Sequence, residues 1–260
     1  MLYPIKKQNV VRGLHVFVAG LARAGTTILM RQLYATGVFR SLTYRDMPFV
    51  MAPNLWAAFT GRMRHQMAAQ ERAHGDGILV DFDSPEALDE VFWRIQCGAR
   101  YIHPDHLAPM QATPEDRSAF QAYVAAILRS QPKKRYLSKN NNNILRLPDL
   151  AQSFPQAMIL IPFRDPLDHA VSLQHQHQTF LTRHAEDPFS LRYMNWLAHH
   201  EFGANHKPFR FYGAGPAGDP TRDLGYWLQL WQKTYDYAAR TAPRQAIFVC
   251  YETLCDETDQ

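Results

Sequence analysis

The sequence contains few cysteines and no long apolar run. Its three cysteines, Cys97, Cys250 and Cys255, are odd in number and irregularly spaced, which argues against a disulfide framework or a zinc site. No stretch reaches the roughly 18 to 20 apolar residues that a membrane-spanning helix needs. The first residues also lack the charged region and apolar run of a signal peptide. We therefore expect reduced thiols and a cytoplasmic protein without a membrane span.

Excess charge is also lacking. The 28 Lys and Arg residues nearly balance the 24 Asp and Glu residues, so the 260-residue chain has a formal net charge of only +4. This value is too small to indicate a nucleic-acid partner, although it is compatible with an anionic ligand. With 46% hydrophobic residues, the chain can bury a core as one domain or as two closely packed ones. We expect a single domain over residues 1–260, and the sequence leaves its oligomeric state open.

A glycine loop near the N-terminus lacks the lysine that its spacing leads one to expect. Residues 16–18 predict a short apolar strand, and Thr26 and Thr27 open a helix after the loop that runs from Gly20 to Gly25. A strand, a tight turn and a helix N-terminus together form a phosphate-binding nest of backbone N–H groups. The two glycines have P-loop spacing, but Thr26 replaces the lysine that contacts the β and γ phosphates of a nucleoside triphosphate.

Arg23 supplies the missing positive charge from inside the loop. A loop with this rearrangement suits a shorter anionic group, held by backbone amides, threonine hydroxyls and one guanidinium. A plain connection between strand and helix, with glycines for turning, is the alternative interpretation. The loop therefore indicates an anion site and makes triphosphate chemistry less favoured.

Strands alternate with helices along the rest of the chain. This order predicts an α/β fold with three layers, in which helices flank a central, mainly parallel sheet, as in P-loop-containing nucleoside triphosphate hydrolases. We expect further strands at residues 41–45, 77–81, 136–138, 157–163 and 246–251. We expect helices at residues 84–95, 114–128, 223–240, and from 166 onward. Residues 180–222 are rich in His, Gly, Pro and aromatics, and we expect a lid or insertion there rather than part of the core.

A second basic site follows the apolar run at residues 157–163, the strongest candidate for a buried parallel strand. Arg164 comes at the carboxyl end of this strand, where α/β sheets bind ligands, and Ser172 lies about two helical turns into the next element. Arg164 and Ser172 can then grip one phosphate from two sides. A surface ion pair of Arg164 with Asp165 or Asp168 is the alternative.

In this order and separation, the two segments resemble the sulfotransferase family, whose members use 3′-phosphoadenosine 5′-phosphosulfate (PAPS). The resemblance also covers YLSKNNNNILRLPDL, with Lys139, and VCYETL, with Tyr251, and it is nearer to the glycan-directed, protein-directed or bacterial branches than to the small-phenol branch. It implies that Lys139 lies near the transferring group, that Arg164 and Ser172 hold the 3′-phosphate, and that Tyr251 approaches the adenine. The 5′-phosphosulfate would be held by Arg23, Ala24, Gly25, Thr26 and Thr27. No metal is required, because sulfuryl transfer needs positioning and charge stabilisation.

The general base is where the sequence departs from the small-phenol branch. That branch has Lys-Thr-His at this strand end, whereas this chain has Lys139 followed by asparagines, which cannot accept a proton. Other branches take a carboxylate from just after the first helix and second strand, so the resemblance implies Asp46 as the base, with Arg23 and Lys139 as the other catalytic groups. Asp89 and Glu90 compete for this role, but we expect them on a solvated helix face, with Glu90 paired to Arg94 at i,i+4.

The expected function is sulfuryl transfer from PAPS to a hydroxyl or amine of a small molecule, glycan, lipid or protein. A P-loop-like kinase or other phosphotransferase is one alternative, and a non-catalytic nucleotide-binding module is another. His175 and His177 do not predict a metal site, because residues two apart lie on different faces of a helix. Relatives continue past the strand before Tyr251, whereas this sequence ends at Gln260, which indicates either a truncated or a minimal member.

Overall fold

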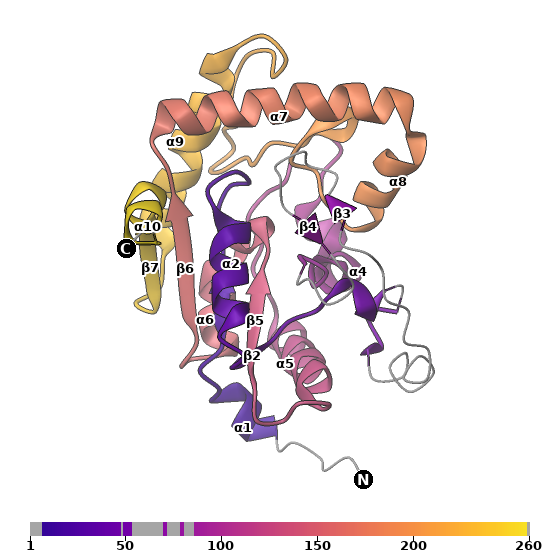
Figure 1. The fold of residues 1–260 in the computed structure, drawn as a ribbon, viewed down its shortest axis with the longest axis vertical. Helices are drawn as coiled ribbons and strands as arrows, with labels where there is room; N and C mark the ends of the chain where they lie inside the picture. The colour runs from indigo at the N-terminus through magenta and orange to yellow at the C-terminus, as the bar shows by residue number, and fades with distance from the viewer. Residues whose placement is uncertain (1–6, 48, 54–69, 72–78, 81–85, 259–260) are drawn as a thin grey trace.

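The protein is built on a five-stranded parallel sheet with the strand order β2-β5-β1-β6-β7 (Figure 1). The computed structural model describes residues 7–47, 49–53, 70–71, 79–80 and 86–258. The strands of this sheet are β1 (Val16–Val18), β2 (Phe39–Arg40), β5 (Arg135–Lys139), β6 (Met158–Phe163) and β7 (Ala246–Cys250). The mainly parallel central sheet expected from the sequence is thereby confirmed.

Strand β1 lies between β5 and β6, with Val18 opposite both Lys139 and Leu160. All three strands are parallel, so their carboxyl ends meet at one edge of the sheet. The glycine loop follows β1, Lys139 ends β5 and Arg164 follows β6. This register brings three segments that are far apart in sequence to one place.

Helices cover both faces of the sheet, because its strand residues point alternately to two apolar clusters. Val16 and Val18 pack with Leu29 and Met30 of α2 (Thr26–Ala35), whereas Phe17 faces the larger cluster. That cluster includes buried residues of α4 (Glu90–Tyr101), α5 (Pro114–Leu128), α6 (Leu147–Ser153) and α9 (Leu224–Thr241). The expected three-layer arrangement is confirmed. Other elements include α1 (Lys7–Val11), η2 (Asn141–Arg146), α10 (Tyr251–Thr258) and the antiparallel pair β3 (Gln70–Glu71) and β4 (Leu79–Val80).

Helix α7 (Pro166–Glu186) crosses the carboxyl edge of the sheet, and α8 (Pro188–Trp196) and η3 (Gly203–Asn205) follow it (Figure 1). Residues 180–222 are not separate from the core, because Phe180, Phe202 and Phe209 belong to the main apolar cluster. That part of the sequence-based expectation is wrong. The movement of this segment as a lid remains a prediction.

Three expected elements differ from the observed ones. Residues 41–45 do not form a strand, because Thr43 and Asp46 make a capping box at the N-terminus of the short helix η1 (Tyr44–Asp46). Helix α4 begins only at Glu90, while the expected start at residues 84–85 lies outside the described residues. Its buried face includes Trp93, whereas Ile95 is 65% exposed. The last strand stops one residue before Tyr251, which begins α10.

In the part of the chain that the structure describes, no helix combines the length and the apolar character needed to cross a membrane.

Two aromatic side chains of α9 pack inward against the rest of the fold. Trp227 is fully buried, and the Tyr235 hydroxyl donates a hydrogen bond to the Pro162 carbonyl oxygen at 2.9 Å. These residues therefore help to fix α9 against the sheet.

Candidate active site

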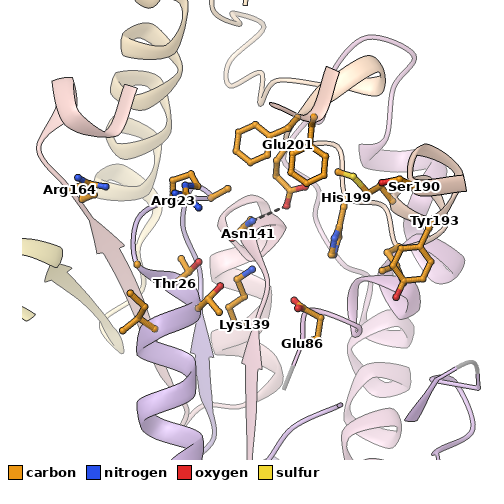
Figure 2. A pocket seen from close by; sticks show the side chains of 18 of the residues that line it. Arg23, Thr26, Glu86, Lys139, Asn141, Arg164, Ser190, Tyr193, His199 and Glu201 are labelled. Atoms are coloured by element: carbon orange, nitrogen blue, oxygen red, sulfur yellow. Dashed lines mark hydrogen bonds between the residues drawn. The ribbon is translucent and has the colours of Figure 1, made fainter. Parts of the chain in front are cut away.

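A cavity of about 300 Å³ lies at the carboxyl edge of the sheet (Figure 2). One side, here called the cationic wall, consists of Arg23, Thr26, Thr27, Lys139 and Arg164. The opposite side, here called the apolar wall, consists of Phe180, Tyr193, Met194, Leu197 and Phe202. Glu86, Asn141 and Glu201 lie among the residues that line the space between the two walls.

The glycine loop exposes the N-terminus of α2 to this cavity. Gly25 is the N-cap residue of α2, and as a glycine it makes no side-chain cap hydrogen bond to the helix. Arg23 and Gly25 have left-handed backbone angles, φ 70° and φ 80°, which lets the chain turn sharply and direct successive N–H groups to one side. Uncapped amides at the positive end of a helix dipole make an anion-binding site. Ala24 is fully buried within the loop and is not a lining residue of the cavity.

Only glycine fits at position 25. A Cβ atom added there would lie 2.4 Å from Cδ2 of Tyr251, whose ring packs against the loop. The same ring lies beneath the Arg164 guanidinium, whose Cζ is 4.9 Å from the ring centroid. Tyr251 therefore contacts both the glycine loop and Arg164.

Arg23 and Ser172 lie in direct contact, although the sequence predicted opposite ends of a ligand for them. Arg23 Nε donates a hydrogen bond to Ser172 Oγ at 3.1 Å. Ser172 is on α7, so this bond connects the glycine loop to the helix that follows β6. The two predicted phosphate subsites are thus adjacent.

Arg164 is not paired with Asp165 or Asp168, the alternative that the sequence left open. Asp165 instead caps α7 by accepting hydrogen bonds from the amides of Leu167 and Asp168. The nearest carboxylate to Arg164 is that of Glu252, 4.0 Å from Nε. This Nε is buried and has no hydrogen-bond partner among the described residues. A buried, unsatisfied guanidinium donor beside the cavity fits an anionic ligand.

Asp89 and Glu90 are not on a solvated face, so that expectation is wrong. Glu90 is fully buried and accepts two 2.9 Å hydrogen bonds from Arg146, which is also fully buried. Asp89 accepts hydrogen bonds from Tyr136 and Ser138, and burial raises its pKa. The i,i+4 spacing suggested a surface pair of Glu90 with Arg94, but α4 begins at Glu90 and turns its first carboxylates toward the core. Arg94 instead donates a hydrogen bond to the Trp196 carbonyl oxygen.

The asparagine run connects these buried carboxylates to both sides of the cavity. Asn140 and Asn142 donate to Glu90, and Asn142 also donates to the Ala198 carbonyl oxygen at 3.3 Å. Asn141 donates to Glu201 Oε1 at 2.8 Å, a bond drawn in Figure 2. The run therefore fixes the end of β5, where Lys139 lies only 8% exposed, against the segment after α8.

Glu201 keeps its charge although its surroundings are largely buried. Burial acts to raise its pKa, but the nearby His199 and the hydrogen bond from Asn141 lower the pKa below its usual value. Lys139 adds to this lowering. A carboxylate therefore stands in the cavity near the Lys139 ammonium.

Asp46 is buried and already engaged. Its carboxylate accepts hydrogen bonds at 2.7 and 2.8 Å from Arg40 Nη2 and at 2.8 Å from the Thr43 amide. Among the described residues that line the cavity, the carboxylates are those of Glu86 and Glu201, and Asp46 is absent. Glu86 accepts a hydrogen bond from the Tyr44 hydroxyl at 3.0 Å and points toward the Lys139 side of the cavity (Figure 2). Sequence patterns gave no signal for Glu86 or Glu201.

The histidines of α7 lie on different faces, as expected. His175 is exposed, whereas His177 is buried and accepts a hydrogen bond from the Gly203 amide at 3.2 Å. Burial lowers the pKa of His177 to about 4. Within the described ranges, no three His, Cys, Asp or Glu side chains are grouped as a metal ion would need. The independence of the chemistry from metal remains an expectation.

A parallel sheet, with the N-terminus of a helix and three cations at its carboxyl edge, defines an α/β protein whose cavity suits an anion. A model of the sulfotransferase family matches residues 15–213. The chain therefore belongs to the sulfotransferase family. A search of curated protein sequences finds no match.

Solved sulfotransferases with similar folds come from several bacteria. STF1 from Mycobacterium tuberculosis is 14% identical with a TM-score of 0.48, over 96% of this chain and 65% of its own. STF9 from Mycobacterium avium is 14% identical with a TM-score of 0.47, over 97% of this chain and 63% of its own. A sulfotransferase from Alicyclobacillus acidocaldarius is 14% identical with a TM-score of 0.40, over 94% of this chain and 75% of its own. This chain thus spans less than two thirds of the two mycobacterial proteins, and these similarities are too distant to indicate a substrate.

Proposed function

We propose that this protein transfers a sulfuryl group from PAPS to a hydroxyl or amine of an acceptor. The observation that carries the proposal is the meeting of the uncapped α2 N-terminus with Arg23, Lys139 and Arg164 at one cavity. Two phosphate-like groups need two cationic positions, and the loop and Arg164 supply them on either side of Tyr251. The family match supports the same donor.

The donor's charged groups have matching partners in the cationic wall. Loop amides and the hydroxyls of Thr26 and Thr27 would hold the 5′-phosphosulfate, with Arg23 neutralising its charge. Arg164 and Ser172 would hold the 3′-phosphate, which distinguishes PAPS from its unphosphorylated relative. The buried Nε of Arg164 has no other hydrogen-bond partner in the described part of the chain, so a phosphate oxygen would satisfy it. Tyr251 would lie against the adenine.

The chain's own residues account for the transfer step. The acceptor oxygen or nitrogen attacks sulfur in line while the bond from sulfur to the bridging phosphate oxygen breaks, and this oxygen gains negative charge. Lys139 and the α2 N-terminus would stabilise that charge. The acceptor's proton would pass to Glu86, since it lines the cavity on the side facing Lys139, whereas Asp46 is held by Arg40. Glu86 therefore replaces Asp46 as the proposed base.

Calorimetric titration with 3′-phosphoadenosine 5′-phosphate (PAP) and with ATP tests the nucleotide assignment. We expect tight binding of PAP without Mg²⁺ and weak binding of ATP. The rival phosphotransferase would instead show Mg²⁺-dependent ATP turnover, and the lysine missing after Gly25 speaks against it. Indifference to PAP would rule out the proposed function.

Turnover of PAPS in Glu86→Gln and Asp46→Asn separates the two carboxylates. We expect Glu86→Gln to lose turnover by about 10²- to 10⁴-fold while it keeps PAP affinity. Asp46→Asn should keep turnover and lose stability, because it loses the Arg40 ion pair. The opposite pattern would return the base to Asp46. Wild-type PAP binding without PAPS turnover on any acceptor would favour the non-catalytic module.

The cytoplasmic location also stays a prediction.

A further inference from the structure

We propose that the protein docks on anionic phospholipid membranes through the amino edge of its sheet, which lies opposite the cavity. The strands are parallel, so the segments that lead into β1, β2, β5, β6 and β7 all meet at this edge. It is the lower end of the sheet in Figure 1, beside α1. Exposed cations and exposed apolar side chains gather there, and a charged lipid surface binds this combination.

The edge cations are five exposed Lys and Arg side chains from three separate segments. They are Arg12 before β1, Arg129 and Lys133 between α5 and β5, Arg135 at the start of β5, and Arg244 before β7. Among the described residues, no carboxylate is ion-paired with any of the five. Neighbouring strands lie about 4.8 Å apart, so the edge of this sheet is about 20 Å wide. The five charges therefore act on one small surface.

Carboxylates are missing from the same edge. The segments that lead into the five strands contain no Asp or Glu at all: residues 7–15, 31–38, 125–135, 153–157 and 241–246. The whole chain has 24 acidic residues against 28 basic ones, so the two signs are unevenly distributed over the molecule. The modest net charge of +4 thus conceals a positive local field, which attracts an anionic surface.

Three apolar side chains are exposed among the edge cations. Leu14 is 51% exposed, Val38 is 47% exposed and Met158 is 43% exposed. They adjoin the cations, because the Arg135 amide donates a hydrogen bond to the Val38 carbonyl oxygen at 3.0 Å. Met158 lies opposite Val16 in the neighbouring strand, two residues after Leu14. Apolar side chains between cations suit the boundary between lipid headgroups and acyl chains.

The same side chains favour a membrane over a nucleic acid. Single-stranded nucleic acids bind by stacking their bases on aromatic rings. Leu14, Val38 and Met158, the large apolar side chains that are exposed at the described part of this edge, are all aliphatic. Aliphatic side chains gain instead from contact with the acyl chains of a lipid.

Docking at the amino edge leaves the cavity open. Strand β6 has six residues, so the two edges of the sheet lie about 20 Å apart. The cavity is at the carboxyl edge and would face away from the membrane. Membrane binding therefore does not depend on the proposed function, and its test requires neither PAP nor turnover.

Co-sedimentation of the protein with lipid vesicles tests the docking surface. We expect binding to phosphatidylcholine vesicles that contain about 30% phosphatidylserine, and at least about tenfold weaker binding to phosphatidylcholine alone. Raising NaCl from about 0.1 M to about 0.5 M should weaken binding to the anionic vesicles by at least about tenfold, because salt screens exposed charges.

Two pairs of substitutions locate the binding to the amino edge. Each Lys or Arg near an anionic membrane strengthens binding by a factor of about five. Arg129→Gln combined with Lys133→Gln should therefore weaken binding to the anionic vesicles by about 25-fold. Arg12→Gln combined with Arg244→Gln should have a similar effect, although these residues belong to other segments. All four side chains are exposed, so urea unfolding midpoints should match that of the wild type.

A matched control removes two exposed cations from the opposite side of the molecule. Arg192 is on α8, and Arg222 follows Thr221, whose carbonyl oxygen accepts a hydrogen bond from Gln178 of α7. Arg192→Gln combined with Arg222→Gln should change binding by less than about twofold, because these charges lie more than a Debye length from the docked membrane. Leu14→Gln should weaken binding by at least about fourfold, the value of one buried CH₂ group, at both salt concentrations.

Several results would overturn the docking surface. It is overturned if neither kind of vesicle binds, if both bind equally, or if salt has no effect. Equal losses in the two edge pairs and in the control pair would also overturn it, since the binding would then follow total charge. An RNA oligonucleotide that binds more tightly than the anionic vesicles would assign this edge to nucleic acid instead.

Discussion

The cationic wall and the apolar wall of the cavity are built in different ways. Lys139 ends β5, Arg164 follows β6, and the glycine loop follows β1, so the register of three adjacent parallel strands sets the cationic wall. The apolar wall comes from α7, α8 and the segment before η3, which are placed by packing against one another. The positions of the charges therefore depend on the sheet, whereas the shape of the apolar wall depends on how the helices pack.

The largest expected effect concerns Glu90, the buried carboxylate that the asparagine run contacts. Glu90→Gln leaves the buried Arg146 guanidinium without a counter-charge, so the free energy of unfolding should fall by about 3–5 kcal/mol. Urea unfolding measures it. Glu186→Gln, an exposed position at the end of α7, should change it by less than about 0.5 kcal/mol. Equal stabilities for wild type and Glu90→Gln would show that the ion pair of Glu90 with Arg146 does not stabilise the fold.

A change confined to the cationic wall should affect chemistry more than binding. Lys139→Gln removes the charge that we propose stabilises the leaving oxygen, so kcat for PAPS turnover should fall by about 10²- to 10³-fold. PAP affinity should fall by less than about tenfold, because the loop amides and Arg164 still hold it. Lys133→Gln, at an exposed position before β5, is the control. A loss of PAP affinity with kcat unchanged would make Lys139 a binding residue only.

The far end of the cationic wall should select for one phosphate. Arg164→Ala should weaken PAP binding by about 1.5–3 kcal/mol, the value of a hydrogen bond to a charged group. Binding of adenosine 5′-phosphate, which lacks the 3′-phosphate, should be nearly unchanged. Calorimetry with both nucleotides measures this, with the exposed Arg129→Ala as control. Equal losses for both nucleotides would refute the assignment.

An effect that depends on pH concerns His169, where α7 meets the glycine loop. Its Nε2 lies 2.8 Å from the Ala22 carbonyl oxygen and must donate to it, and burial lowers the pKa of His169 from 6.5 to about 4. The folded protein keeps the ring neutral while the unfolded chain binds a proton below about pH 6.5. Stability should therefore fall as the pH drops from about 6.5 to 4.

Urea unfolding at several pH values between 7 and 4.5 measures the contribution of His169. His169→Gln should reduce the slope of the free energy of unfolding against pH by up to about 1.4 kcal/mol per pH unit. His175→Gln, at an exposed position on the same helix, should leave the slope unchanged. If the two variants have the same slope, His169 does not titrate as its burial indicates.

The cationic wall could be predicted from the sequence because each of its parts follows a short apolar run. The runs before Gly20 and Arg164 form parallel strands as expected, and the cations then follow from position alone. Asp46 was selected by the family resemblance, but the Thr43 capping box and Arg40 hold it away from the cavity. Local patterns thus place a residue at a strand end without showing what its side chain contacts.

The acceptor side could not be predicted, because its residues are ordinary core residues in sequence. Phe180, Met194 and Phe202 carry no motif, and they line the cavity because α7 crosses the sheet edge and α8 and the segment before η3 follow it. Glu90 shows the converse error. Its i,i+4 neighbour Arg94 suggested a surface pair, whereas Arg146 from η2 reaches it through the core. Contacts between distant segments decide both cases.

The central position of β1 also bears on how the protein is made. Val16 pairs with Leu137 on one side and with Met158 on the other, so β1 finds its neighbours only in the second half of the chain. Contacts of such long sequence separation form slowly, because a long loop must close before they are gained. During synthesis, the apolar β1 stays unpaired until β5 has left the ribosome, and its other side stays open until β6 follows; unpaired apolar strands aggregate. The glycine loop after β1 therefore takes its final shape only once these later strands have joined the sheet.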